Sequence, residues 1–315
     1  MRIMRMLDLQ ASHLDRMSPV ELLESIRSAE GRTVAAEVIA RSRPLLGDVS
    51  NPELAKAMGA DLIILNMLDL EDPRVEGLHN PSDLESLFRS SFFHGDEPEP
   101  SNGIRLARAL TGCPVGVNLE PLGDPGGVSL PPGRLATPEN ARRAAELGAS
   151  FLIVTANPHT RIGVRHIMDA VRSIRRAVPE VIIGAGKMHA AMSDSPWGDL
   201  PDLAEEMMSA GADLVLIPCP GSVPSLSQEV FAQAADRVHR LGGLVMSTIG
   251  TSQEGSDRET IRQMALMAKM GGADVQHIGD SGYSGMAVPE NIMTLSLAIR
   301  GRRHTFRRMA RSIAR

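Results

Sequence analysis

A short phrase recurs four times along the chain and constrains its architecture. Each copy places Gly-Ala and then Asp or Ser before an apolar run; the copies are residues 58–66, 147–155, 210–218 and 271–277. Glycine suits the left-handed turn that ends many helices. Apolar runs of four to six residues are typical of strands buried on both faces of a parallel sheet. The phrase therefore predicts a repeated helix–turn–strand unit.

Eight such apolar runs can be counted, which is the number that closes a barrel. They begin near Thr33, Asp61, Pro114, Ser150, Glu180, Asp213, Gly243 and Asp274. An open doubly wound sheet usually has fewer strands and a Gly-rich turn after the first, whereas residues 40–44 here read Ala-Arg-Ser-Arg-Pro. We therefore expect one domain over residues 1–315: a (β/α)₈ TIM barrel at 33–299, a capping segment at 1–32 and a basic tail at 300–315.

Helix starts are readable beside these strands. Ser18-Pro-Val-Glu21 forms a capping box, which predicts a helix before the first strand that could close the N-terminal end of the barrel. Asn51 and Thr137 each precede a proline and are expected to cap the helices that follow.

Composition narrows the classes of partner. A net charge of −5 and 3% aromatic residues make nucleic acid and acidic membranes poor expectations. Two cysteines indicate a reducing compartment, and no apolar run reaches the roughly 18 residues that cross a bilayer. We expect a cytoplasmic protein that forms a homo-oligomer.

Polar residues gather where the predicted strands end, and a barrel brings these ends into one ring. Lys187 and His189 follow the fifth strand, Glu37 lies in the first and Glu120 follows the third, so these four are the candidate catalytic residues. Glu37 and Lys187 could instead pair with one another and be structural. The other expected pocket residues are Asn66, Asn118, Asn157, Gln253, His277 and Asp280.

Two Gly/Ser/Thr-rich segments, 249–255 and 278–285, follow the seventh and eighth strands, where barrels commonly hold a substrate phosphate. Glycine lets backbone N–H groups approach an anion. The expected phosphate ligands are Gly250, Thr251, Ser252, Gly279, Ser281 and Gly282. Glu254 and Asp280 would repel a phosphate unless a cation lies between. A divalent metal such as Mg²⁺ is therefore an alternative, with candidate ligands Glu37, Glu120, His189, His277 and Asp280.

Three further features leave alternatives open. Residues 67–103 and 121–136 interrupt the regular spacing and are either surface excursions or substrate-covering lids. Cys219 is a candidate nucleophile, but a buried bystander thiol is the better expectation. The stretch from Arg300 to Arg315 carries seven arginines and no acid. It is read as a solvated basic helix against the barrel or a partner subunit, with a phosphate-contacting tail as the alternative and nucleic-acid binding as the weakest.

Several phrases resemble an uncharacterised bacterial barrel family. They include Gly116-Val-Asn-Leu-Glu-Pro121, Gly186-Lys-Met-His-Ala190 and Arg300-Gly-Arg-Arg-His-Thr-Phe306. Its members are often labelled haloacid-dehalogenase-like hydrolases or phosphoenolpyruvate-phosphonomutase-like proteins. The first strand offers Glu37 and no Asp-x-Asp, so the dehalogenase mechanism does not fit. Lys187-Met-His189 only faintly matches the Lys-x-Cys-Gly-His loop of phosphonomutases.

These observations favour an enzyme that acts on a small phosphorylated metabolite, by C–C lyase (aldolase-type) or isomerase chemistry at the C-terminal mouth of the barrel. Metal-dependent hydrolysis is the first alternative. A non-catalytic sensor or assembly protein that uses the basic tail is the second.

Overall fold

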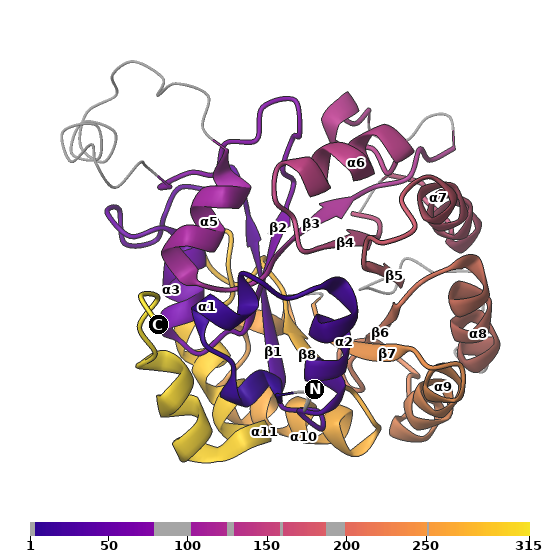
Figure 1. Cartoon of the computed structure of the whole chain (residues 1–315). Coiled ribbons are helices and arrows are strands. Elements are labelled where there is room, and N and C mark those ends of the chain that lie inside the picture. The colour runs from indigo at the N-terminus through magenta and orange to yellow at the C-terminus, as the bar shows by residue number, and fades with distance from the viewer. Residues whose placement is uncertain (1–3, 79–101, 125–128, 158–159, 187–198, 251) are drawn as a thin grey trace.

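The computed structural model shows a closed barrel of eight parallel strands (Figure 1). It describes residues 4–78, 102–124, 129–157, 160–186, 199–250 and 252–315. The strands are β1 (Thr33–Ile39), β2 (Leu62–Asn66), β3 (Val115–Leu119), β4 (Phe151–Val154), β5 (Ile183–Gly186), β6 (Leu214–Pro218), β7 (Leu244–Ile249) and β8 (Val275–Ile278).

The strands follow one another around the barrel in chain order, and β8 closes on β1 through the pairing of Thr33 with Val275. The predicted TIM barrel is confirmed, and each predicted strand begins within three residues of the observed one. The chain-order topology follows from the repeated unit, because each crossover returns to the adjacent parallel strand.

Helices surround the barrel and fill each crossover that the structure describes (Figure 1). They are α3 (Asn51–Ala57), α5 (Gly103–Thr111), α6 (Pro138–Glu146), α7 (Val164–Ala177), α8 (Leu200–Ala210), α9 (Gln228–Arg240), α10 (Arg258–Met270) and α11 (Pro289–Met309). Short 3₁₀ turns occur at η1 (Met6–Asp8), η2 (Pro132–Arg134) and η4 (Gln253–Gly255).

The predicted cap of α3 was placed one residue too late. Ser50 is the N-cap, and its side chain and that of Glu53 form a reciprocal capping box. Asn51 is buried and tethers two loops instead: it accepts from the Leu45 amide at 3.0 Å and donates to the Ser284 carbonyl at 3.0 Å. The predicted Thr137 cap of α6 is confirmed by a 3.2 Å bond from the Asn140 amide.

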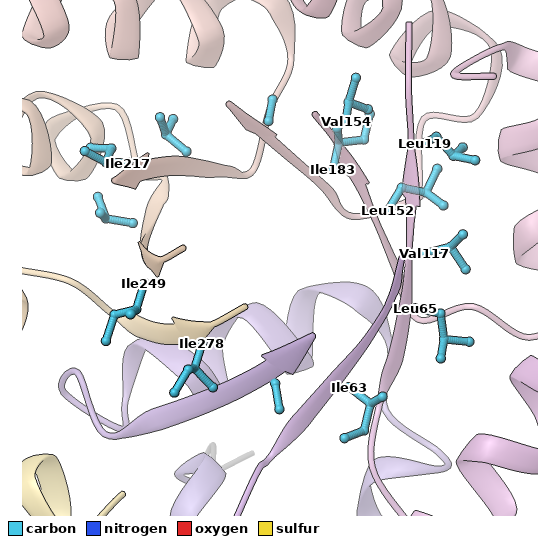
Figure 2. Packing of buried hydrophobic residues seen from close by; sticks show 14 of the residues in the cluster. Ile63, Leu65, Val117, Leu119, Leu152, Val154, Ile183, Ile217, Ile249 and Ile278 are labelled. Atoms are coloured by element: carbon cyan, nitrogen blue, oxygen red, sulfur yellow. The ribbon is translucent and has the colours of Figure 1, made fainter. Parts of the chain in front are cut away.

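Strand side chains alternate between two packed layers. One set points outward against the helices, and Figure 2 shows its members Ile63, Leu65, Val117, Leu152 and Ile217 around the barrel. The other set fills the barrel interior and includes Ala35, Leu62, Ile64, Phe151, Ile153, Leu214, Leu216, Leu244, Met246 and Val275. Gly116 gives room for an interior aromatic ring, since a Cβ there would overlap the ring of Phe151.

The N-terminal end of the barrel is plugged by apolar residues that precede β1. Leu22 and Ile26 of α2 (Pro19–Arg27), with Met6, Leu7 and Leu9, belong to the same buried cluster as the interior side chains. The Ser18 side chain accepts from the Glu21 amide, which confirms the predicted capping box. Figure 1 shows α2 lying over the N-terminal end of the barrel.

The basic tail continues α11 as a helix against the barrel up to Met309, as the sequence had suggested, and most of its arginines are exposed, but two of them are buried. Arg300 and Arg308 are 6% exposed, and both form ion pairs with the fully buried carboxylate of Asp61 at the start of β2. Arg308 also donates to the Leu9 carbonyl at 2.9 Å, which fastens the N-terminal segment. Between these two buried arginines α11 bends at Gly301 (φ 70°).

Two sequence expectations fall partly outside the described residues: the insertion at 67–103 is described only to residue 78 and from 102, and the segment 121–136 lacks 125–128. In the part of the chain that is described, no helix combines the length and apolarity needed to cross a bilayer.

Candidate functional site

The centre of the strand-end ring is a buried group of three side chains. Glu37 of β1 accepts a hydrogen bond from Asn118 Nδ2 of β3, and its other oxygen lies 3.1 Å from His277 Nε2 of β8. All three are at most 3% exposed. With the carboxylate as acceptor, the Nε2 proton of His277 is donated to Glu37, and Nδ1 has no partner among the described residues.

A second chain of polar contacts runs beside this group. Asn66 at the end of β2 donates from Nδ2 to Asp280 at 2.7 Å, and its Oδ1 accepts from the Met67 amide, which fixes the orientation of its side-chain amide. Asn157, which follows β4, lies 3.4 Å from Asn66. The Ser281 hydroxyl donates to the other Asp280 oxygen at 3.2 Å.

Glu120 directly follows β3 and is held by a different partner. Its carboxylate forms an ion pair with Arg134 of η2, and it accepts the Asn157 amide at 3.1 Å. The Glu120 side chain is 2% exposed and that of Arg134 is 12% exposed. The position of Glu120 is therefore fixed by a neighbouring loop. Arg134 was not predicted from the sequence, since it lies inside an irregular Gly/Pro-rich segment.

Burial changes the acidity of Asp280. Loss of water around this carboxyl, together with the nearby negative charge of Glu37, raises the pKa of Asp280 to about 7, although hydrogen bonds from Asn66 and Ser281 act in the opposite direction. A carboxyl with a pKa near neutrality can both give and accept a proton at physiological pH. Asp280 is therefore the side chain of this site best suited to general acid–base chemistry.

Glu254 joins the cluster from the loop after β7. It is 1% exposed, and desolvation raises its pKa, while the charge of His277 and hydrogen bonds from backbone N–H groups, including that of Ser281, oppose the rise. The sequence had marked Glu254 only as an obstacle to phosphate. Its burial could not be read from a Gly/Ser-rich loop, where a glutamate is normally exposed.

Four buried polar atoms of the cluster have no hydrogen-bond partner among the described residues. They are Asn118 Oδ1, Thr155 Oγ1, Glu254 Oε2 and His277 Nδ1. Unpaired buried polar atoms are costly, and in native proteins they usually bind water or a ligand. Thr155 follows the inward-facing Phe151 and Ile153 on β4 by the strand alternation, so its hydroxyl faces the same interior. The mouth therefore offers donors and acceptors to a small polar molecule.

The predicted phosphate ligands lie in the two loops that meet at this cluster. Gly250 and Ser252 follow β7, while Gly279, Ser281 and Gly282 follow β8; Thr251 is outside the described residues. Two of their backbone amides already donate hydrogen bonds within the protein. Gly279 N–H donates to the Ile249 carbonyl at 2.8 Å, and Ser281 N–H donates to the Glu254 carboxylate.

Lys187 and His189, the two remaining catalytic candidates, are outside the described residues, so the alternative pairing of Lys187 with Glu37 and the roles of both residues toward a substrate remain predictions. The described strand β5 ends at Gly186, directly before Lys187.

The structure also bears on the expected metal site and on Cys219. No cluster of three or more His, Cys, Asp or Glu side chains suited to a metal is found in the described ranges. The Glu120 carboxylate already pairs with Arg134 and accepts a hydrogen bond from the Asn157 amide, so it is a poor metal ligand. Cys219 is fully buried with its thiol 3.3 Å from the Met264 carbonyl, and burial raises its pKa to about 12, as suits a bystander rather than a nucleophile.

Fold and site together define a (β/α)₈ barrel with a buried acid–amide cluster at the C-terminal ends of its strands. The chain belongs to the family described as "Domain of unknown function (DUF7916)", whose sequence model matches residues 7–315.

Relatives outside this family share only part of the sequence. GMP reductases from Shewanella pealeana and Shewanella halifaxensis are each 31% identical over 124 residues. The aligned region covers 36% of this chain, and the chain spans about a third (32%) of the length of those relatives.

Solved structures resemble the chain in fold. The carboxyl transferase domain of Rhizobium etli pyruvate carboxylase has a TM-score of 0.50 at 14% identity, covering 97% of this chain and 52% of the other. A 2,3-dimethylmalate lyase of the PEP mutase/isocitrate lyase superfamily has a TM-score of 0.49 at 11% identity, covering 83% and 81%. At these identities the likenesses concern the fold alone.

Proposed function

We propose that this protein is an enzyme that moves a proton on a small phosphorylated metabolite at the C-terminal mouth of the barrel, in a lyase (aldolase-type) or isomerase reaction. The observation that carries the proposal is the buried cluster of Glu37, His277, Asp280 and Glu254, in which burial brings the pKa of Asp280 to about 7. Such perturbed groups in a polar interior are typical of acid–base sites.

The residues divide the work as follows. Asp280, fixed by Asn66, exchanges a proton with the carbon or oxygen of the substrate. His277 Nδ1, held in place by the Glu37 bond, is the second proton-transfer group. Asn118 and Thr155 supply the unpaired acceptor and hydroxyl that position a polar substrate. Lys187 is proposed to polarise or bind the carbonyl, which borohydride trapping with sugar phosphates tests directly.

The phosphate part of the proposal is supported by position. The loops that follow β7 and β8 are rich in glycine and lie where barrel enzymes commonly bind phosphate. GMP, named as the substrate of the partly similar reductases, is itself a phosphate ester.

Solvent deuterium exchange tests the proposal. Wild-type protein is incubated in D₂O with a panel of phosphorylated aldehydes, ketones and keto acids, and loss of the C–H signal is followed by NMR. We expect exchange with at least one member, and a decrease of about 100-fold or more in Asp280→Asn. Glu290→Gln, which removes an exposed carboxylate at the start of α11, serves as the control and should exchange as wild type. Equal exchange by Asp280→Asn and wild type would refute the role of Asp280.

A further inference from the structure

The loop that carries Glu254 is anchored at its backbone. Asn291 of α11, which is 2% exposed, donates from Nδ2 to the carbonyl oxygens of Glu254 at 2.9 Å and Ser256 at 2.7 Å. Both donor hydrogens of the Asn291 amide are thus directed at this loop. These two hydrogen bonds hold the η4 turn against α11, and the fold thereby fixes the position of the Glu254 side chain.

The Glu254 carboxylate lies between the two Gly-rich loops. A Cβ added at Gly282 would lie 3.1 Å from Glu254 Cγ, and one added at Gly279 would lie 3.6 Å from its Cδ. The Ser281 amide, an expected phosphate ligand, donates to this carboxylate. An internal carboxylate therefore occupies the position, between the β7 and β8 loops, that the sequence assigned to the substrate's phosphate.

The charges around Glu254 do not neutralise it fully. His277 of β8 attracts its negative charge and Glu37 of β1 repels it, while α11 contributes the neutral Asn291. Asp280 adds another carboxyl two residues before Gly282. One oxygen, Oε2, has no partner among the described residues, so it is available to carry a proton and donate to an incoming anion.

We propose that Glu254 is the specificity-determining residue of the mouth: a doubly charged anion binds between the β7 and β8 loops only when the Glu254 carboxylate takes up a proton from solvent. The protonated Oε2 then donates a hydrogen bond to the anion, and no other bond is made or broken. The inference rests on the proposed function, because it concerns the group that holds the substrate's phosphate. Burial, which raises the pKa of Glu254, makes this protonation accessible.

Sulfate binding measured by calorimetry tests the inference, since sulfate keeps its charge between pH 6 and pH 8. At pH 8 we expect Glu254→Gln to bind sulfate about tenfold or more tightly than wild type, because a like charge is removed at close range. The difference should shrink at pH 6, where more of the wild-type carboxyl is protonated. The control Glu259→Gln removes an exposed carboxylate from α10 and should bind as wild type.

Proton uptake on binding gives a second readout that is independent of affinity. Wild type titrated at pH 8 in buffers of different ionisation enthalpy should take up more protons on binding sulfate than Glu254→Gln does. Equal affinity of Glu254→Gln and wild type at pH 8, equal proton uptake, or absence of sulfate binding by both would each overturn the inference. Deuterium exchange involves none of these measurements, so a retained exchange activity would leave the proton-transfer function standing.

Discussion

The fold disfavours ionisation of the Asp280 carboxyl. Its pKa of about 7 lies above the ordinary aspartate value of 3.8, chiefly because the side chain is buried. Folding therefore favours the protonated form, and the stabilising effect of that proton is present at low pH and is lost as pH rises from about 4 to 7. Above pH 7 the folded protein carries a buried charge that costs free energy.

Replacing Asp280 by Asn should accordingly stabilise the protein at alkaline pH. We expect the gain in unfolding free energy of Asp280→Asn over wild type to increase by about 2 kcal/mol between pH 5 and pH 8. Urea denaturation at the two pH values measures it, with Glu290→Gln as the control. A gain that is independent of pH would show that Asp280 ionises in the folded state as it does in the unfolded chain.

At the residue scale the sequence indicated which residues belong to the site better than it indicated which of them contact one another. Glu37, Asn66, Asn118, His277 and Asp280 were all predicted from their places at strand ends, and the structure brings them together. Their partners could not be predicted, because side-chain pairing depends on the stagger between strands. The role of Arg134 depends on the path of a loop that has no periodic pattern.

The element scale is illustrated by the pairing of β3 with β4. Gly116 lies opposite Phe151, whose ring covers it within the barrel. Glycine is needed here for space and not for backbone freedom, since Gly116 has no positive φ. The four-residue strand β4 therefore fills the interior with one large ring where other strands contribute aliphatic side chains.

Gly116→Ala should destabilise the barrel by about 1–3 kcal/mol, because overpacking forces the ring or the strands to move. The double variant Gly116→Ala/Phe151→Leu should recover part of this loss, since Leu is smaller than Phe. Thermal unfolding of both variants and of Phe151→Leu alone would complete the cycle. Additive effects of the two substitutions would contradict the predicted contact.

For elements, the sequence was a good guide to strands and helix ends, because burial on both faces and capping chemistry are local signals. For the tail it predicted the basic helix but not the buried contacts that two of its arginines make. A stretch with seven arginines and no acid resembles a solvated helix, and only the closed barrel reveals that Asp61, some 240 residues earlier, is its partner.

At the scale of the whole molecule, Asp61 joins parts of the chain that are far apart. It pairs with Arg300 and Arg308, and it accepts the Val34 amide of β1 at 2.9 Å. Arg308 in turn holds the N-terminal segment at the Leu9 carbonyl. One buried carboxylate therefore connects the tail, the first two strands and the N-terminal plug.

Asp61→Asn should lower the free energy of unfolding by about 3–5 kcal/mol, because it leaves two buried guanidinium groups without their counter-charge. Asp15→Asn is the matched control: its partner Arg108 is at the surface and its own side chain is 78% exposed, so a change below about 1 kcal/mol is expected. Chemical denaturation measures both. If Asp61→Asn unfolds like the control, the cluster does not stabilise the barrel.

The plugged end of the barrel has a consequence for how this protein can change. The apolar plug and the ion pairs of Asp61 lie at the N-terminal end, whereas the unpaired polar atoms Asn118 Oδ1, Thr155 Oγ1 and His277 Nδ1 come from residues at the other. Substitutions that alter chemistry at the mouth thus fall away from the plug and from the ion pairs of Asp61. A loss of stability at the C-terminal mouth can therefore be offset by a stabilising substitution at the N-terminal end. The residues of the mouth can then change, and with them the substrate, while the barrel stays folded.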